Sequence, residues 1–246
     1  MLDALRSRMN LAFTRRLVRS PEGRAHLLSQ LAEAESSGEA RIFDQALARV
    51  DDPELARMIE KHRADELRHE ALFRDRLART GATAEVPREL RLIDRIDAAL
   101  GGFLARPIAS AHGVMEAYVL LQVVEERAVT QMPLLAQALR EVDPGSAATL
   151  DAVLADEERH LKYCRAISRR YAAGEEELAA ALAGFREVEA RAFRENQIAN
   201  GAWVIDHGLM GRGAGSLPWR LLLAAARSLP DLPLTPFAAG PRVATA

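Results

Sequence analysis

The sequence predicts an all-α protein whose centre is a four-helix bundle. Ala, Leu, Arg and Glu dominate, and aromatic residues make up only 5% of the chain, a composition typical of helices. No run of alternating β-branched residues bounded by turn signals suggests a strand. A phrase also recurs, since "ADELRH" at residues 64–69 is nearly repeated as "ADEERH" at residues 155–160. The 246 residues, 49% of them hydrophobic, can bury one substantial core.

Two long helices are predicted in the first part of the chain. Apolar residues recur at helical spacing over residues 26–50, and Asp51-Asp52-Pro53 ends that helix and starts a second one, which runs to about residue 78. After the breaker "TGATAEVP", residues 88–100 form a shorter amphipathic piece that Gly101-Gly102 ends. We expect this piece to cross from one helical hairpin to the next.

Three further helices are predicted in the second part. They cover residues 110–141, 147–172 and 175–208, with Asp143-Pro144-Gly145 as the turn between the first two. In the tail that follows, rich in Gly, Pro and Ser, only "WRLLLAAARSL" is periodic. The expected organisation is a basic amphipathic N-terminal helix, the four-helix bundle, and an additional helix with a Pro- and Gly-containing tail, over residues 1–25, 26–172 and 173–246.

The repeat extends beyond six residues. An offset of 91 positions relates Glu66 to Glu157 and His69 to His160, and the same offset relates the turns at Asp52 and Asp143. Each copy is therefore a helix, an Asp-Pro turn and a second helix that carries Glu-x-x-His. Two such hairpins form a four-helix bundle.

The Glu-x-x-His spacing favours a metal site. Residues three apart lie on one face of a helix, so the glutamate and the histidine can point at one object. A carboxylate buried in that position is costly unless a partner or a metal neutralises it. The alternative is an internal salt-bridge network with Arg68 and Arg159. Because the motif is duplicated at equal offset on the inner helix of each hairpin, we favour the metal.

Two metals require further carboxylates from the outer helices. Glu35 and Glu126 are related by the offset of 91, and each lies 17 residues before the aspartate of its turn. We therefore choose this pair, although Glu39 and Glu125 remain rival assignments. His62, one turn before Glu66, could support a ligand or be an extra ligand, but the pattern favours a partly exposed core histidine.

The ligand order Glu, Glu-x-x-His, Glu, Glu-x-x-His resembles the ferritin-like di-iron carboxylate superfamily over residues 28–170. "DELRH" and "DEERH" are similar to the Asp-Glu-x-Arg-His motif of its oxygen-activating branch, with distant similarity to demethoxyubiquinone hydroxylases and di-iron tRNA hydroxylases. The resemblance implies that Asp65 and Asp156 orient His160 and His69 across the bundle. It also implies that Arg68 and Arg159 hold these aspartates.

The same resemblance implies the chemistry. The metal ligands would be Glu35, Glu66, His69, Glu126, Glu157 and His160, and the four glutamates among them would be the catalytic residues. They would hold two iron ions, or manganese or a mixed pair, and the protein would activate O2 to hydroxylate or otherwise oxidise a small organic molecule with electrons from a separate donor. An iron-handling ferroxidase or peroxide scavenger is the alternative enzyme, and a binding scaffold held by salt bridges is the non-enzymatic alternative.

The remaining features limit partners and location. The balance of 33 basic and 35 acidic residues gives no indication of a nucleic-acid partner. The single cysteine, Cys164, excludes an intramolecular disulfide framework, and no apolar run reaches the roughly 18 residues of a spanning helix, so we expect a cytoplasmic protein. The basic segment 1–20 and the tail could contact an anionic membrane, pack on the bundle or form a homodimer contact.

Overall fold

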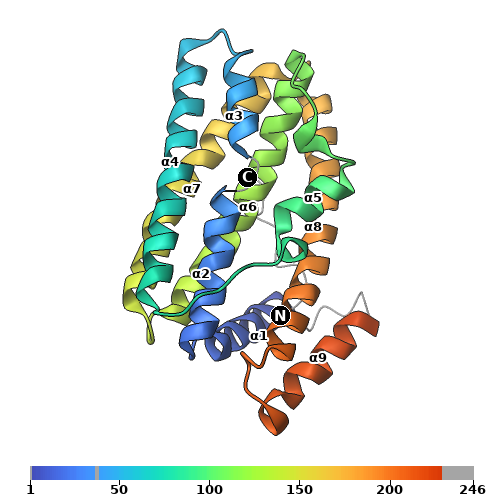
Figure 1. The fold of residues 1–246 in the computed structure, drawn as a ribbon. Coiled ribbons are helices and arrows are strands. Elements are labelled where there is room, and N and C mark those ends of the chain that lie inside the picture. Colours follow the sequence, from blue (N-terminus) through green and yellow to red (C-terminus); the bar gives the residue numbers. More distant parts are fainter. Residues whose placement is uncertain (1, 37–38, 229–246) are drawn as a thin grey trace.

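All regular structure in the computed structural model, which describes residues 2–36 and 39–228, is helical, so the all-α prediction is confirmed (Figure 1). The α-helices are α1 (Leu2–Leu17), α2 (Pro21–Ser36), α3 (Glu39–Leu47), α4 (Pro53–Arg79), α5 (Leu92–Ala99), α6 (Ala111–Leu139), α7 (Pro144–Tyr171), α8 (Glu175–Asp206) and α9 (Leu217–Ser228). Short 3-10 turns lie at Arg88–Leu90, Phe103–Ala105 and Gly213–Ser216.

Helices α2, α4, α6 and α7 lie lengthwise beside one another and form the central bundle (Figure 1). Helix α2 packs on α4, α6 packs on α7, and the two helices that carry Glu-x-x-His, α4 and α7, contact each other. The repeated hairpins are thus brought together through their inner helices.

The prediction of one helix over residues 26–50 was wrong in its bounds. The first outer segment is two helices, α2 and α3, and residues 37–38 between them lie outside the described residues. Helix α2 also begins earlier, at Pro21, because the Gly23 amide donates a hydrogen bond of 3.0 Å to Ser20 Oγ and proline is tolerated in a first turn. A side chain at position 23 would collide with the Leu17 carbonyl, so glycine permits the tight turn from α1 into α2.

The two Asp-Pro turns act as helix caps. Asp52 Oδ1 accepts the amide hydrogens of Glu54 and Leu55 at the start of α4, at 2.8 and 3.3 Å. Asp143 accepts the Ser146 amide and hydroxyl at 3.0 and 2.7 Å at the start of α7. Asp143 is also bound by Arg76 of α4 at 2.6 Å, so this cap connects the two inner helices.

Two apolar layers fill the bundle, one above and one below its middle. The upper layer contains Ile42, Ile59, Tyr118, Leu121 and Ile167. The lower layer contains Leu28, Phe73, Leu139, Leu150 and Val153. On every one of the long bundle helices, the residues between these layers include buried polar side chains. The apolar layers therefore enclose a polar layer at mid-height.

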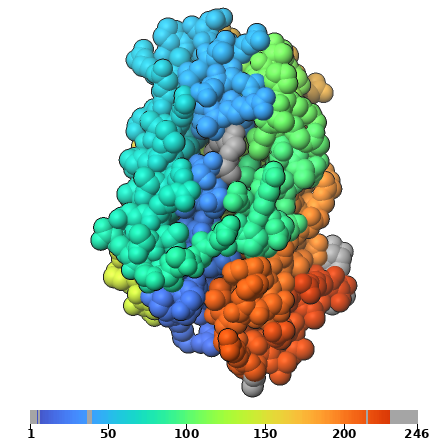
Figure 2. Space-filling model, viewed as in Figure 1, coloured from blue at the N-terminus to red at the C-terminus, as the bar shows by residue number. Residues whose placement is uncertain are grey.

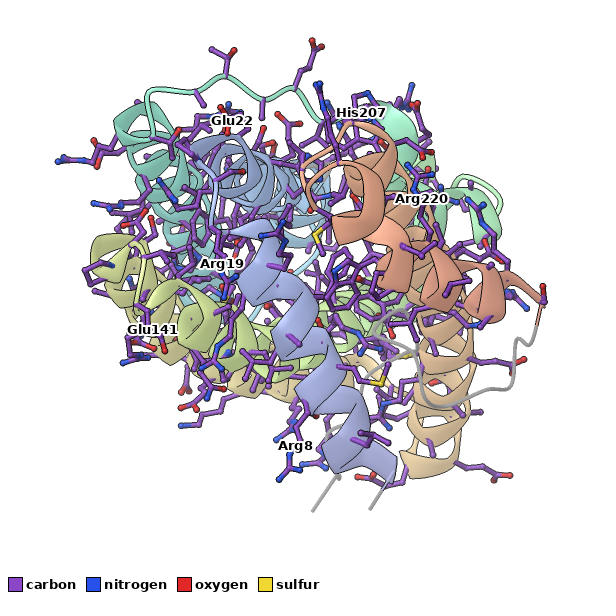
Figure 3. All side chains as sticks on the ribbon, turned by 90° about the horizontal axis from the view of Figure 1, so that it is seen from below. Arg8, Arg19, Glu22, Glu141, His207 and Arg220 are labelled. Atoms are coloured by element: carbon purple, nitrogen blue, oxygen red, sulfur yellow. The ribbon has the colours of Figure 1, made fainter. Side chains whose placement is uncertain are left out.

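Helix α1 packs on α6 of the bundle, and α9 packs on α8. Figure 3 shows α1 across the lower end, with Arg8 and Arg19 near its two ends and α9 beside it. The rings of Phe13 and Trp219 meet edge to face at 5.3 Å, and Leu17 lies in an apolar cluster with Ile205 and Leu223. Among the described residues, none of the helices combines the length and apolar character that crossing a membrane requires.

Replacing Asp143 by alanine should lower the free energy of unfolding by about 1–2 kcal/mol, because it removes a helix cap and the Arg76 contact. Burial raises the pKa of Asp143, but hydrogen bonds from Ser146 and the Arg76 charge outweigh it and lower that pKa overall. A lowered pKa stabilises the fold above the unfolded value of 3.8, and this contribution is lost as pH falls through the folded-state pKa.

Urea unfolding at pH 7 and pH 3 measures both effects. The exposed Asp51→Ala variant is the matched control and should change stability little. Equal losses for Asp143→Ala and Asp51→Ala would contradict the capping role.

Candidate metal centre

The polar layer at the middle of the bundle holds two groups of His and Glu side chains whose ligand atoms lie within 4.8 Å of one another. The groups share Glu66. One is Glu35, Glu66, His69 and Glu157, and the other is His62, Glu66, Glu125 and His160. The three histidines have no exposed surface, and Glu157 is 2% exposed.

The first group is built by α2, α4 and α7. His69 Nδ1 lies 3.4 Å from Glu35 Oε2 and 3.3 Å from Glu157 Oε1. These distances join atoms from three helices, so the group depends on the packing of α2 and α7 against α4. Glu35 is placed there by the last turn of α2, which ends one residue later.

The second group is built by α4, α6 and α7. His62 Nε2 lies 3.0 Å from Glu125 Oε1 and 3.3 Å from Glu66 Oε1. His160 Nδ1 lies 3.1 Å from Glu66 Oε1, and the rings of His62 and His160 stack at 3.9 Å. This group thus has two imidazoles and two carboxylates, whereas the first has one imidazole and three carboxylates.

Two glutamates connect the groups. Glu66 belongs to both. The two oxygens of Glu157 diverge, with Oε1 near His69 and Oε2 2.8 Å from His160 Nδ1. The glutamates of the two Glu-x-x-His motifs therefore occupy the positions that could bridge two metal ions.

Two aspartates hold the outer nitrogens of the imidazoles. His160 Nε2 lies 3.3 Å from Asp65 Oδ2, and His69 Nε2 lies 3.2 Å from Asp156 Oδ2, each pair joining α4 to α7. This is the crossed pairing that the resemblance implied. An imidazole that donates Nε2–H to a carboxylate keeps the lone pair of Nδ1 free for a metal.

Arginines neutralise these aspartates. Arg159 donates to Asp65 at 2.7 Å, and Arg68 donates to Asp65 at 2.9 Å and also to Asp156. Burial raises the pKa of Asp65, but Lys61, the two arginines and His160 together hold it well below its usual range. Both aspartates are therefore ionised at neutral pH, as acceptors for the histidines must be.

The pKa values within the cluster show how strongly its charges interact. Burial lowers the pKa of His62, but contacts with Cys164 and Glu66 outweigh it and raise that pKa to about 10. Burial also lowers the pKa of His69, yet Glu157 raises it overall. The pKa of Glu66 is lowered despite burial, because His160 and His62 hydrogen bond to its carboxylate. The buried carboxylates thus require positive charge beside them.

Two divalent cations fit this requirement. The four carboxylates of the cluster carry a charge of −4, which two divalent ions balance while all three imidazoles stay neutral. His69 Nδ1 is buried and makes no hydrogen bond of ordinary geometry, although it faces two carboxylate oxygens. A neutral imidazole and a carboxylate repel through their lone pairs unless a proton or a metal ion lies between them. Imidazole and carboxylate ligands suit iron and manganese.

The structure does not bring Glu126 to this cluster. Arg186 of α8 binds the Glu126 carboxylate with two hydrogen bonds of 2.9 and 2.6 Å, and Gln122 donates a third at 3.0 Å. Glu125 occupies the position expected of Glu126. The prediction relied on the equal distance of 17 residues from each glutamate to the aspartate of its turn. In the first hairpin this stretch contains the interruption between α2 and α3, whereas in the second it begins in the continuous helix α6, so equal counts do not give equivalent positions. One residue rotates a helix position by about 100°.

The prediction of His62 as a partly exposed core histidine was wrong about its exposure, since the side chain is fully buried, and it omitted the contacts with Glu66 and Glu125. The signal was present, since His62 precedes Glu66 by four residues and so lies on the same helix face. Glu39 begins α3, and its side chain lies outside the described residues. Cys164 is fully buried among the upper apolar layer, as expected of a small core residue.

Comparisons with protein-family models, curated proteins and solved structures find no significant match to this chain.

Replacement of Glu125 by glutamine should lower the metal content from about two ions per chain to about one, because it removes one of the two carboxylates from the second group. The matched variant Glu126→Gln alters the neighbouring residue of the same helix and breaks only the contacts with Arg186 and Gln122. It should retain both ions.

Elemental analysis of the two purified variants after reconstitution with Fe2+ measures this difference. The assignment of Glu125 is contradicted if Glu126→Gln loses metal while Glu125→Gln retains it.

Proposed function

We propose that this chain is a di-metal oxidoreductase of the ferritin-like type, which uses O2 to hydroxylate or otherwise oxidise a small organic molecule. The observation that supports it is the pair of buried ligand groups that share Glu66 between two Glu-x-x-His helices. In the proposed site the ligands are Glu35, Glu66, His69 and Glu157 on one side, and His62, Glu125 and His160 on the other. Two iron ions, or manganese or a mixed pair, would supply redox chemistry with dioxygen.

The protein side chains would perform three tasks. The carboxylates would neutralise the ions, and Glu66 and Glu157, which contact both ligand groups, would be held by both. Asp65 and Asp156 accept Nε2–H of His160 and His69 and so keep each Nδ1 unprotonated and directed inward. The apolar layers above and below exclude bulk water, which strengthens every charge interaction in the site.

The supply of electrons is part of the proposal. Reaction of O2 with an organic C–H bond consumes two electrons beyond those of the substrate, so a separate electron donor is required. No other redox group is built into the proposed site, and Cys164 is a single buried thiol. A ferroxidase differs in this respect, because Fe2+ itself is its electron source and its substrate.

The chemically reduced, iron-loaded protein should take up O2, and Glu66→Ala should abolish that uptake because Glu66 belongs to both ligand groups. Glu60→Ala is the matched control, since Glu60 is an exposed glutamate on the same helix, and it should react as the parent does. An oxygen electrode and metal analysis on the same samples measure the result.

Titration with excess Fe2+ separates the proposal from the iron-handling alternative. An oxygenase site should fill at about two ions per chain and then stop consuming O2. Continued O2 uptake with accumulation of ferric product beyond two ions would favour the ferroxidase. Reconstituted protein that binds no metal would reject both and leave a scaffold held by ion pairs.

A further inference from the structure

A second feature of the molecule is a cavity of about 250 Å³ between the bundle and the additional helices. Residues of α1, α2, α5, α6 and α8 line it together with the segment before α5. Most of the wall is apolar, and its members include Leu27, Leu31, Ile93, Ile96, Phe193 and Val204. Figure 2 shows the segment before α5 and α5 itself on the face of the molecule, where they lie over α2 and beside α8.

The cavity begins beside the candidate metal centre. Ala34 of α2 and Val124 of α6 line it, and each directly precedes a member of the cluster, Glu35 or Glu125. Adjacent Cα atoms are 3.8 Å apart, so this part of the lining lies near the cluster, although none of the cluster residues themselves line the cavity. From Ala34 the lining continues along α2 to His26, a distance of about 12 Å at 1.5 Å per residue. The cavity therefore extends along α2, and one part of it lies near the centre.

The cavity carries no uncompensated charge. Its charged lining residues, Glu33 and Arg91, form an ion pair of 3.0 Å with each other. Burial lowers the pKa of His26 to about 4, so this lining histidine is neutral at physiological pH. The other polar lining side chains are one hydroxyl and uncharged amides, those of Asn10, Gln30, Gln131, Asn196, Gln197 and Asn200. An ion entering here would lose hydration without gaining a counter-charge.

We propose that this cavity is the binding site of an uncharged, mainly apolar organic molecule with at most a hydroxyl or carbonyl group for the amides to bind. The volume corresponds to roughly eight groups the size of a water molecule in the liquid. The proposal that such a molecule binds depends on the cavity alone. The assignment of the bound molecule as the substrate that is oxidised rests on the proposed function, because it uses the position of the cavity beside the cluster.

Isothermal titration of the purified full-length protein tests the proposal with 1-octanol as the probe. The control probes are octanoate and octylammonium, which carry the same chain with a negative or a positive charge. We expect saturable binding of 1-octanol and at least about tenfold weaker binding of both ions, since the desolvation of a charge is costly. Tighter binding of either ion would overturn the uncharged class.

Leu135→Trp fills the cavity from α6 and should weaken 1-octanol binding at least about tenfold. Leu221→Trp is the matched control, because Leu221 is 62% exposed on α9 and does not line the cavity. If circular dichroism shows that Leu135→Trp is unfolded, Ile93→Trp, which fills the cavity from α5, is used instead. Unchanged binding in a folded cavity-filling variant, or no binding to the parent, would overturn the site.

The metal content of each sample separates this inference from the proposed function. A protein that binds 1-octanol but no metal would support the site and refute its role in oxidation. A protein that binds two metals but no 1-octanol would refute the site and leave the proposed function in place.

Discussion

The structure depends on one electrostatic constraint, the burial of four carboxylates and three imidazoles in the centre of a helical bundle. Isolated ions in an apolar interior cost several kcal/mol each, and their mutual attraction repays that cost only when opposite charges are close and fully hydrogen bonded. Around the cluster opposite charges are close, because Arg68 and Arg159 hydrogen bond to the two aspartates that contact the histidines. Inside the cluster, carboxylates outnumber the imidazoles that face them. Two divalent cations, as proposed, would complete the balance.

The repeated hairpin explains how one chain places so many ligands in one layer. Each copy contributes an inner helix with Glu-x-x-His and an aspartate that reaches the histidine of the other copy. The capped Asp-Pro turns set where α4 and α7 begin, and Arg76 ties the second turn to the first inner helix. The register of the two motifs therefore follows from local signals at the turns, combined with the apolar layers on both sides.

The sequence alone predicted an all-α fold, most of the long helices and both Glu-x-x-His motifs, because these depend on identity and spacing within a continuous helix. The crossed Asp–His pairs were implied by the resemblance to the ferritin-like di-iron proteins. It did not predict Glu125 in place of Glu126. That choice depends on the helix break between Ser36 and Glu39 and on Arg186, which comes from α8 and engages Glu126. His62 could be placed on the correct face but not assigned to the cluster, since its contact with Glu125 comes from a different helix. The cavity could not be predicted from the sequence either, because residues from five helices and a loop line it.

Helices outside the four-helix bundle contribute to the cavity. Helices α1, α5 and α8 close an apolar space along α2 and α6, and α9 packs on the lower part of α8 (Figure 1). A scaffold whose core contained only ion pairs would not need such a space. Under the proposed function, this space would hold the organic molecule near the metal ions.

Anomalous diffraction from crystals loaded with iron tests the central claim most directly. Two peaks inside the bundle are predicted for each chain, one among Glu35, His69 and Glu157 and the other among His62, Glu125 and His160, with Glu66 beside both. A cluster that shows no peak, with its carboxylates paired to histidines alone, would contradict the di-metal account.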